Sequence, residues 1–88
     1  MAHVAQDELV AQIKRAEGLI RVGGIYSHYK NPDNLYKVIG FGVVESNDEI
    51  AVLYQAQYGK KLVFVRPLTS WLERVERQGQ KVPRFKII

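Results

Sequence analysis

The chain has 88 residues, and 13 lysines and arginines against 9 aspartates and glutamates give it a formal net charge of +4 at pH 7. Hydrophobic residues make up 47% and charged residues 25% of the sequence, proportions typical of a folded domain rather than a disordered segment. Cysteine is absent, which excludes disulfides and thiolate metal sites. We therefore expect one domain over residues 1–88 that holds no metal and no other cofactor.

The sequence contains no run of apolar residues long enough to cross a membrane. Its first residues also lack the basic and apolar regions of a secretory signal. We therefore expect a cytoplasmic protein that has no membrane partner.

Residues 5–17 have the pattern of an amphipathic helix. Leu9, Ile13 and Ala16 recur at intervals of four and three residues, which places them on one apolar stripe. Gly18 is predicted to end this helix, because a helix commonly ends at a residue with positive φ. We expect the stripe to cover one end of a sheet, and the alternative is a contact between two copies of the chain.

The middle of the chain is predicted to be a series of antiparallel strands joined by short turns. Asn31-Pro32-Asp33-Asn34 is a dense turn signal. Gly40 and Gly42 interrupt a long β-rich run, and glycine inside a strand indicates a bulge or a bend. The predicted strands cover residues 25–30, 35–46, 50–58 and 62–66.

A second helix is predicted to begin at Ser70. Ser70 and Glu73 have the spacing of a capping box, in which each side chain bonds to a backbone N–H of the other residue. The apolar residues here follow a helical stripe that places Trp71 in the core, and Gly79 is the predicted end of the helix. A last strand is expected over 84–88.

This order of elements predicts an α+β fold with about five antiparallel strands. The glycine bends and the helix before the last strand favour a strongly curled sheet or a small SH3-like barrel. The N-terminal helix over 5–17 would precede a β-rich core over 20–88.

Six short segments stand out by their order and spacing. They are Gly24–Lys30, Leu35–Gly40, Glu45-Ser46, Val52–Gln55 with Tyr58-Gly59, Phe64–Leu68 and Val82–Phe85. Together they resemble a bacterial family, the domain-of-unknown-function family number 1653. The resemblance covers roughly residues 20–86, so the helix over 5–17 is an addition to the usual domain. It implies a small bacterial β-rich domain, and it implies no established activity.

Polar side chains inside these strand motifs are the candidate ligand-binding residues, because a polar group in a β-run must be solvated, paired or used for binding. One interpretation is structural, with Glu45 paired to Arg66 or Arg84 and the polar groups holding strands in register. The other is a shallow groove for an anion, since the planar fork of arginine matches a carboxylate or phosphate. The candidates are His28, Lys30, Glu45, Gln55, Arg66 and Arg84.

We therefore expect a non-catalytic binding module for a small anionic molecule or a peptide carboxylate, with His28, Arg66 and Arg84 as its main contacts. No catalytic residue is predicted, because the residues that could react have simpler interpretations as turn and cap residues. One alternative is a nucleic-acid-binding domain, in which a basic C-terminal stretch meets phosphates while strand tyrosines stack on bases. Another is a homodimeric interaction module that uses the first helix. The basic stretch includes Arg74, Arg77, Lys81 and Lys86.

Overall fold

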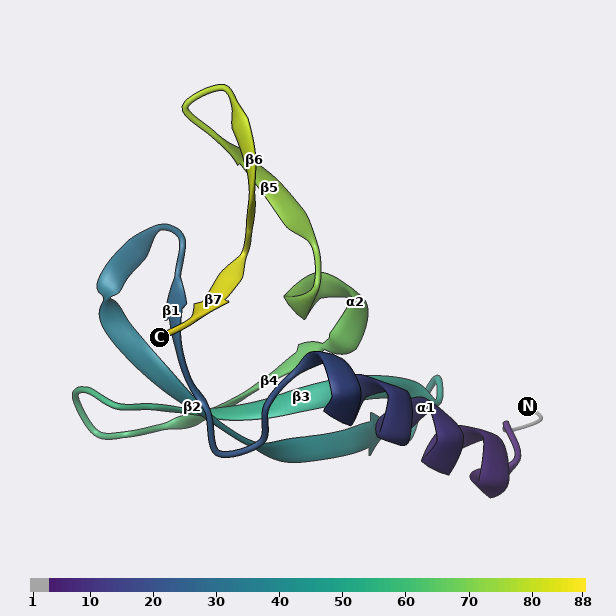
Figure 1. Cartoon of the computed structure of the whole chain (residues 1–88). Coiled ribbons are helices and arrows are strands. Elements are labelled where there is room, and N and C mark those ends of the chain that lie inside the picture. The colour runs from purple at the N-terminus through teal and green to yellow at the C-terminus, as the bar shows by residue number, and fades with distance from the viewer. Residues whose placement is uncertain (1–3) are drawn as a thin grey trace.

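The computed structural model describes residues 4–88, which form two helices and seven strands (Figure 1). No helix in this part of the chain is long and apolar enough to cross a membrane. In chain order the elements are α1 (Gln6–Leu19), β1 (Ile25–His28), β2 (Asn31–Val44), β3 (Glu49–Ala56), β4 (Val63–Pro67), α2 (Leu68–Trp71), β5 (Arg74–Arg77), β6 (Gln80–Pro83) and β7 (Phe85–Ile87).

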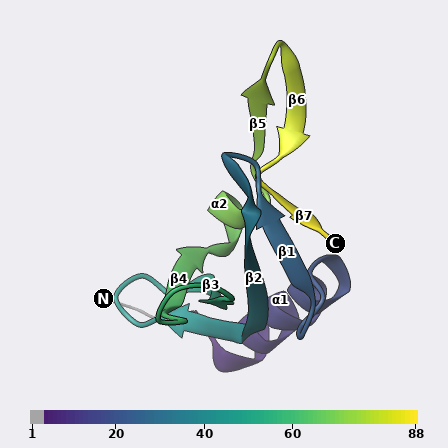
Figure 2. The same cartoon turned by 90° about the vertical axis from the view of Figure 1, so that its left-hand side faces the viewer.

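Five strands form one antiparallel sheet in the order β4-β3-β2-β1-β7. The α+β class and the antiparallel arrangement are confirmed. The predicted barrel and the strong curl are wrong, because β4 and β7 lie at opposite edges and the sheet stays open. Strands β5 and β6 form a separate two-stranded ribbon, which projects away from the sheet (Figures 1 and 2).

The core lies where α2 and the end of α1 meet the sheet. Trp71 is buried, and its ring stacks on Phe85 with centroids 3.7 Å apart and an interplanar angle of 4°. Tyr26 and Tyr54 meet the Trp71 ring edge-on, at 5.3 and 5.0 Å. Ile20 joins the same cluster directly after α1. The predicted core position of Trp71 is therefore confirmed.

The first helix begins one residue later and ends two residues later than the predicted range 5–17. Gly18 lies inside α1 rather than ending it, and a Cβ atom there would meet nothing within 4 Å. The helix ends at Ile20, which turns to an extended conformation with φ −128° while its N–H still bonds to Ala16 O at 2.8 Å. Burial of the Ile20 side chain therefore determines the end, and the positive φ of +83° occurs later, at Gly23.

The second predicted helix is wrong beyond its first turn. Ser70 lies inside the single turn of α2, which has no side-chain cap, so the predicted capping box does not form. After α2 the chain forms the β5–β6 ribbon, in which Val75 pairs with Val82. Gln78 and Gly79 both have positive φ, +54° and +81°, as a two-residue type I′ hairpin turn requires. Gly79 therefore makes a hairpin turn rather than a helix end.

Two irregularities in β2 affect the side chains that it presents. The predicted turn over 31–34 lies inside β2, and the chain reverses at Tyr29-Lys30 instead. The pairing register between β1 and β2 slips between Ser27 and His28. A second slip occurs between Val38 and Gly40, which confirms the bulge that the strand glycines predicted.

Candidate functional site

A pocket of about 290 Å³ opens where β1, β2, β3, β4 and β7 present side chains from one face of the sheet. Four of its eight lining residues are aromatic, and the other four are basic or polar, with no carboxylate among them. The aromatic residues are Tyr36, Tyr54, Phe64 and Phe85, and the others are His28, Lys30, Asn31 and Arg66. The structure thus brings together three of the six predicted ligand-binding residues.

His28 is the last residue of β1, and two rings and a backbone amide surround its imidazole. The rings of Phe85 and Tyr29 lie 4.9 and 4.8 Å away, centroid to centroid. The backbone N–H of Lys30 donates to Nδ1 at 3.2 Å. Burial lowers the pKa of His28 below its ordinary value of 6.5, and the positive charges of nearby arginines and a lysine lower it further. The imidazole is therefore neutral at pH 7, with Nδ1 as an acceptor.

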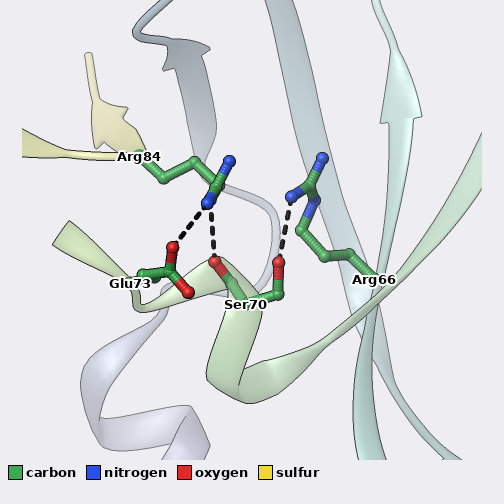
Figure 3. A network of polar contacts seen from close by, with 4 residues as sticks. All are labelled: Arg66, Ser70, Glu73 and Arg84. Carbon is green, nitrogen blue, oxygen red and sulfur yellow. Dashed lines mark hydrogen bonds and ion pairs between the residues drawn. The ribbon is translucent and has the colours of Figure 1, made fainter. Parts of the chain in front are cut away.

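Arg66 reaches the pocket from β4 and is held by neutral partners (Figure 3). Its Nη1 donates to the hydroxyl of Ser70 at 3.0 Å, and its Nε donates to the hydroxyl of Tyr54 at 3.3 Å. The guanidinium also lies 5.3 Å from the centroid of the Phe85 ring. No acid pairs with Arg66 within residues 4–88. Its positive charge is therefore oriented beside the pocket and not neutralised by a carboxylate.

Arg84 is held by other partners, and it does not line the pocket. Its Nε donates to the carbonyl oxygen of Ser70 at 3.0 Å, and its Nη2 pairs with Glu73 Oε1 at 2.9 Å (Figure 3). These bonds connect α2 to the segment that leads into β7. Glu73, predicted to form a capping box with Ser70, pairs with Arg84 instead. Arg84 acts on the site through its charge, which contributes to the lowered pKa of His28.

Tyr36 lies in the centre of the aromatic wall, with its ring 5.5 Å from Tyr54 and 6.1 Å from Phe85. Its hydroxyl forms a hydrogen bond of 2.8 Å with the hydroxyl of Tyr58. Burial and this hydrogen bond raise the pKa of Tyr36 to about 12. The wall therefore carries no negative charge at neutral pH and does not repel an anion.

Besides Arg84, two further predicted site residues lie outside the pocket. Glu45 is exposed after β2 and lines a groove beside α1, so its predicted ion pair with Arg66 or Arg84 does not form. Gln55 donates from its side-chain amide to the carbonyl oxygen of Lys61, across the β3–β4 connection. Strand alternation explains why Gln55 lies outside the pocket, because its neighbour Tyr54 faces the pocket.

The basic residues proposed for nucleic-acid contact lie on the β5–β6 ribbon and on β7. Arg77 donates to the carbonyl oxygen of Tyr29 at 2.6 Å, which connects the ribbon to the β1–β2 turn. Arg74 donates across the ribbon to the carbonyl oxygen of Lys81 at 3.1 Å. Lys86 is exposed on β7 and shares a second cavity, of about 550 Å³, with Arg77.

Sequence reasoning missed Asn31 and the aromatic wall of the pocket. Asn31 was assigned to a turn, whereas the register slip after Ser27 pairs it with His28. The wall had a sequence signal, because Tyr54 and Phe64 follow the two-residue alternation of their strands and pair across β3 and β4. The sequence indicates packing or stacking roles for the strand tyrosines, but it does not indicate that they lie together in one pocket wall.

The pocket combines basic groups with aromatic rings. In the described part of the chain no cluster of three or more histidines or acidic residues could hold a metal ion. The pocket places a neutral imidazole and two cations beside four aromatic rings. The fold and this site define a small α+β domain with an electropositive, ring-lined pocket.

The chain belongs to the family described as "Protein of unknown function (DUF1653)", whose model matches residues 24–87. It is similar to the crystal structure of a DUF1653 protein from Bordetella bronchiseptica, with a TM-score of 0.65 and 29% sequence identity. That match covers 75% of this chain and 85% of the other. No curated protein matches the chain. Helix α1 lies before the matched family segment.

Proposed function

We propose that this domain is a non-catalytic binding module for a small anion or a peptide carboxylate, and that the pocket beside His28, Lys30 and Arg66 is its binding site. The observation that carries the proposal is the composition of the pocket, which has cationic groups at its side and no carboxylate in its lining. Arg66 is the main contact, because neutral partners orient its guanidinium and leave its charge unpaired.

The size and the wall of the pocket set limits on the ligand. At about 290 Å³ the pocket is at the lower end of small-molecule sites, which begin near roughly 300 Å³. The aromatic rings provide apolar contact, and Lys30 provides a flexible charge at the exposed rim. A compact ligand with one carboxylate or phosphate and a flat apolar part fits this combination.

The test is a thermal-shift series with acetate, benzoate, phosphate and neutral benzamide, each at low and high salt. A bound anion raises the melting temperature by mass action, equivalent to about 2.7 kcal/mol at a hundredfold excess over Kd. Lys30→Gln should reduce this shift, because Lys30 adds a second positive charge at the rim beside Arg66. Lys60→Gln removes the same charge from an exposed residue outside the pocket lining, so it should keep the shift.

Equal protection by benzamide and benzoate, or an unchanged shift in Lys30→Gln, would contradict the proposal. An equally reduced thermal shift in Lys30→Gln and Lys60→Gln would mean that anion binding depends only on the net charge of the protein.

Nucleic-acid binding is a second candidate because the basic β5–β6 ribbon projects from the body of the domain (Figure 1). A two-stranded ribbon fits the major groove of DNA. If the ribbon binds there, affinity for a labelled duplex should fall steeply with salt and weaken further in Lys81→Gln. Salt-independent binding, or none, would exclude this candidate.

A further inference from the structure

Strand β4 is an edge strand whose outer side is open to pairing. It pairs with β3 alone. The carbonyl oxygen of Leu62 accepts from the N–H of Ala56 at 2.9 Å, which sets the alternation of the antiparallel ladder. Residues with inward hydrogen bonds then alternate with residues whose backbone groups face outward. Val63 and Val65 are the outward residues, so each offers an N–H and a C=O to another strand.

The side chains of this edge are apolar and exposed on both faces of the sheet. Val63 and Val65 are 50% and 62% exposed, and Leu62 is 60% exposed. Natural edge strands are usually protected from pairing by a charge, a proline or a bulge. Residues 62–65 contain none of these, and the β3–β4 register is regular, while Arg66 and Pro67 lie at the C-terminal end of β4. The other edge, β7, is three residues long and carries Lys86 in its centre.

The charges around β4 indicate what kind of strand fits. Lys60 and Lys61 precede the apolar run, Arg66 follows it, and residues 59–67 contain no acid. The guanidinium of Arg66 is turned toward Tyr54 and Ser70, so the two lysines are the charges that a strand along the outer edge would meet. A second copy supplies no acid to these lysines, because its own residues 59–67 contain none. Acidic residues that flank an apolar centre complement the lysines instead.

We propose that the outer edge of β4 binds an extended segment of a partner protein, with an apolar centre and acidic flanks, which adds to the sheet as a sixth strand. The outward N–H and C=O groups of Val63 and Val65 would supply the main-chain hydrogen bonds. Alternate apolar side chains of the segment would cover the exposed valines, and its acids would lie by Lys60 and Lys61. Such strand addition takes its affinity from main-chain bonds and its selectivity from side chains.

The test uses a fluorescent peptide with blocked ends, in which two glutamates flank each side of a Val-Thr-Val-Thr-Val centre. Val65→Pro removes one outward N–H and leaves the bonds to β3 in place, since proline is tolerated at such edge positions. This variant should bind the peptide at least about tenfold more weakly than the native protein. Val65→Thr keeps the N–H and is the matched control, with affinity close to native. Replacing Lys60 and Lys61 with glutamate should also weaken binding.

Equal affinity of the native protein and Val65→Pro would overturn the proposal, and so would equal binding of a peptide that is N-methylated at all five residues of its centre. A native dimer that ignores the peptide and becomes monomeric in Val65→Pro would show that a second copy occupies the edge. If Val65→Pro fails to fold, alternate N-methylation of the peptide removes donors from one side and gives the same test with the native protein. Lys30→Gln should leave peptide binding unchanged, which separates this site from the pocket.

Discussion

The half-buried imidazole of His28 combines two properties. Its Nδ1 accepts a backbone hydrogen bond, and positive charges from Arg66, Arg84 and Lys30 surround it. Protonation would turn Nδ1 into a donor and add a charge among like charges. The folded protein therefore resists protonation of His28 unless an anion enters the pocket.

We expect His28 to make stability depend on pH in a defined direction. Its pKa is lowered in the folded state, so the unfolded chain takes up a proton first as pH falls below 6.5. The free energy of unfolding should therefore decrease with falling pH through this region, and His28→Gln should show a weaker decrease. Urea unfolding at a series of pH values measures both slopes, and parallel slopes would refute the assignment. A pocket anion should bind more tightly at low pH, because it favours the protonated ring.

At this scale the structure brings His28 and Arg66 to one pocket and places Arg84 outside its lining. Arg66 follows the regular alternation of β4, whereas His28 lies at the register slip between β1 and β2, which the local pattern does not show. The bonds of Arg84 depend on Ser70 and Glu73, whose positions follow from the end of α2 rather than from spacing along the chain. A residue held by contacts across a turn has no periodic signal.

Among the elements, the segment after Trp71 was predicted least well. Its apolar residues fit a helical stripe, and the competing pattern of a hairpin was present as well. Val75 and Val82 are equally distant from Gln78-Gly79, and a glycine between two alternating segments is a hairpin signal. The strands of the main sheet were predicted close to their observed ranges, because long alternating runs carry a stronger signal than four-residue strands.

The turn of the ribbon should control the local stability of β5 and β6. Gly79 has φ +81°, where an L-residue costs about 1 kcal/mol or more, so Gly79→Ala should loosen the ribbon. Gln78→Asn should tighten it, because asparagine tolerates the positive φ at that position. Amide hydrogen exchange over residues 74–83 is the measurement, with faster exchange expected in the first variant and slower exchange in the second. Identical exchange in both would mean that the turn does not limit opening of the ribbon.

On the scale of the whole molecule, α1 is part of the folded body although the matched family segment begins at residue 24. Ala16 is buried, and Ile20, which follows the helix, belongs to the same cluster as Trp71. The addition therefore shares the hydrophobic core of the domain. The sequence predicted this helix but could not show which of its residues the sheet would bury, since that depends on the direction in which the chain leaves α1.

Two variants of α1 should have opposite effects on global stability. Ala16→Asp would bury an unpaired carboxylate and should lower the free energy of unfolding by about 2–4 kcal/mol. Gly18→Ala should raise it by up to about 1 kcal/mol, because Gly18 is helical and space surrounds it. Both values come from chemical denaturation of the full chain. A loss of stability in Gly18→Ala would instead mean that the helix ends there.

The stacking of Trp71 on Phe85 has a consequence for how the domain reaches its native state. Phe85 lies in β7, which pairs with β1 across a separation of about sixty residues, whereas each of the other sheet pairings joins neighbouring strands. Closing a loop of that length costs conformational entropy before the contacts between β1 and β7 can offset it. The four-stranded part of the sheet can therefore assemble early and without its full aromatic core. Docking of β7 would be the late event that shields the indole from water, and tryptophan fluorescence would report it directly.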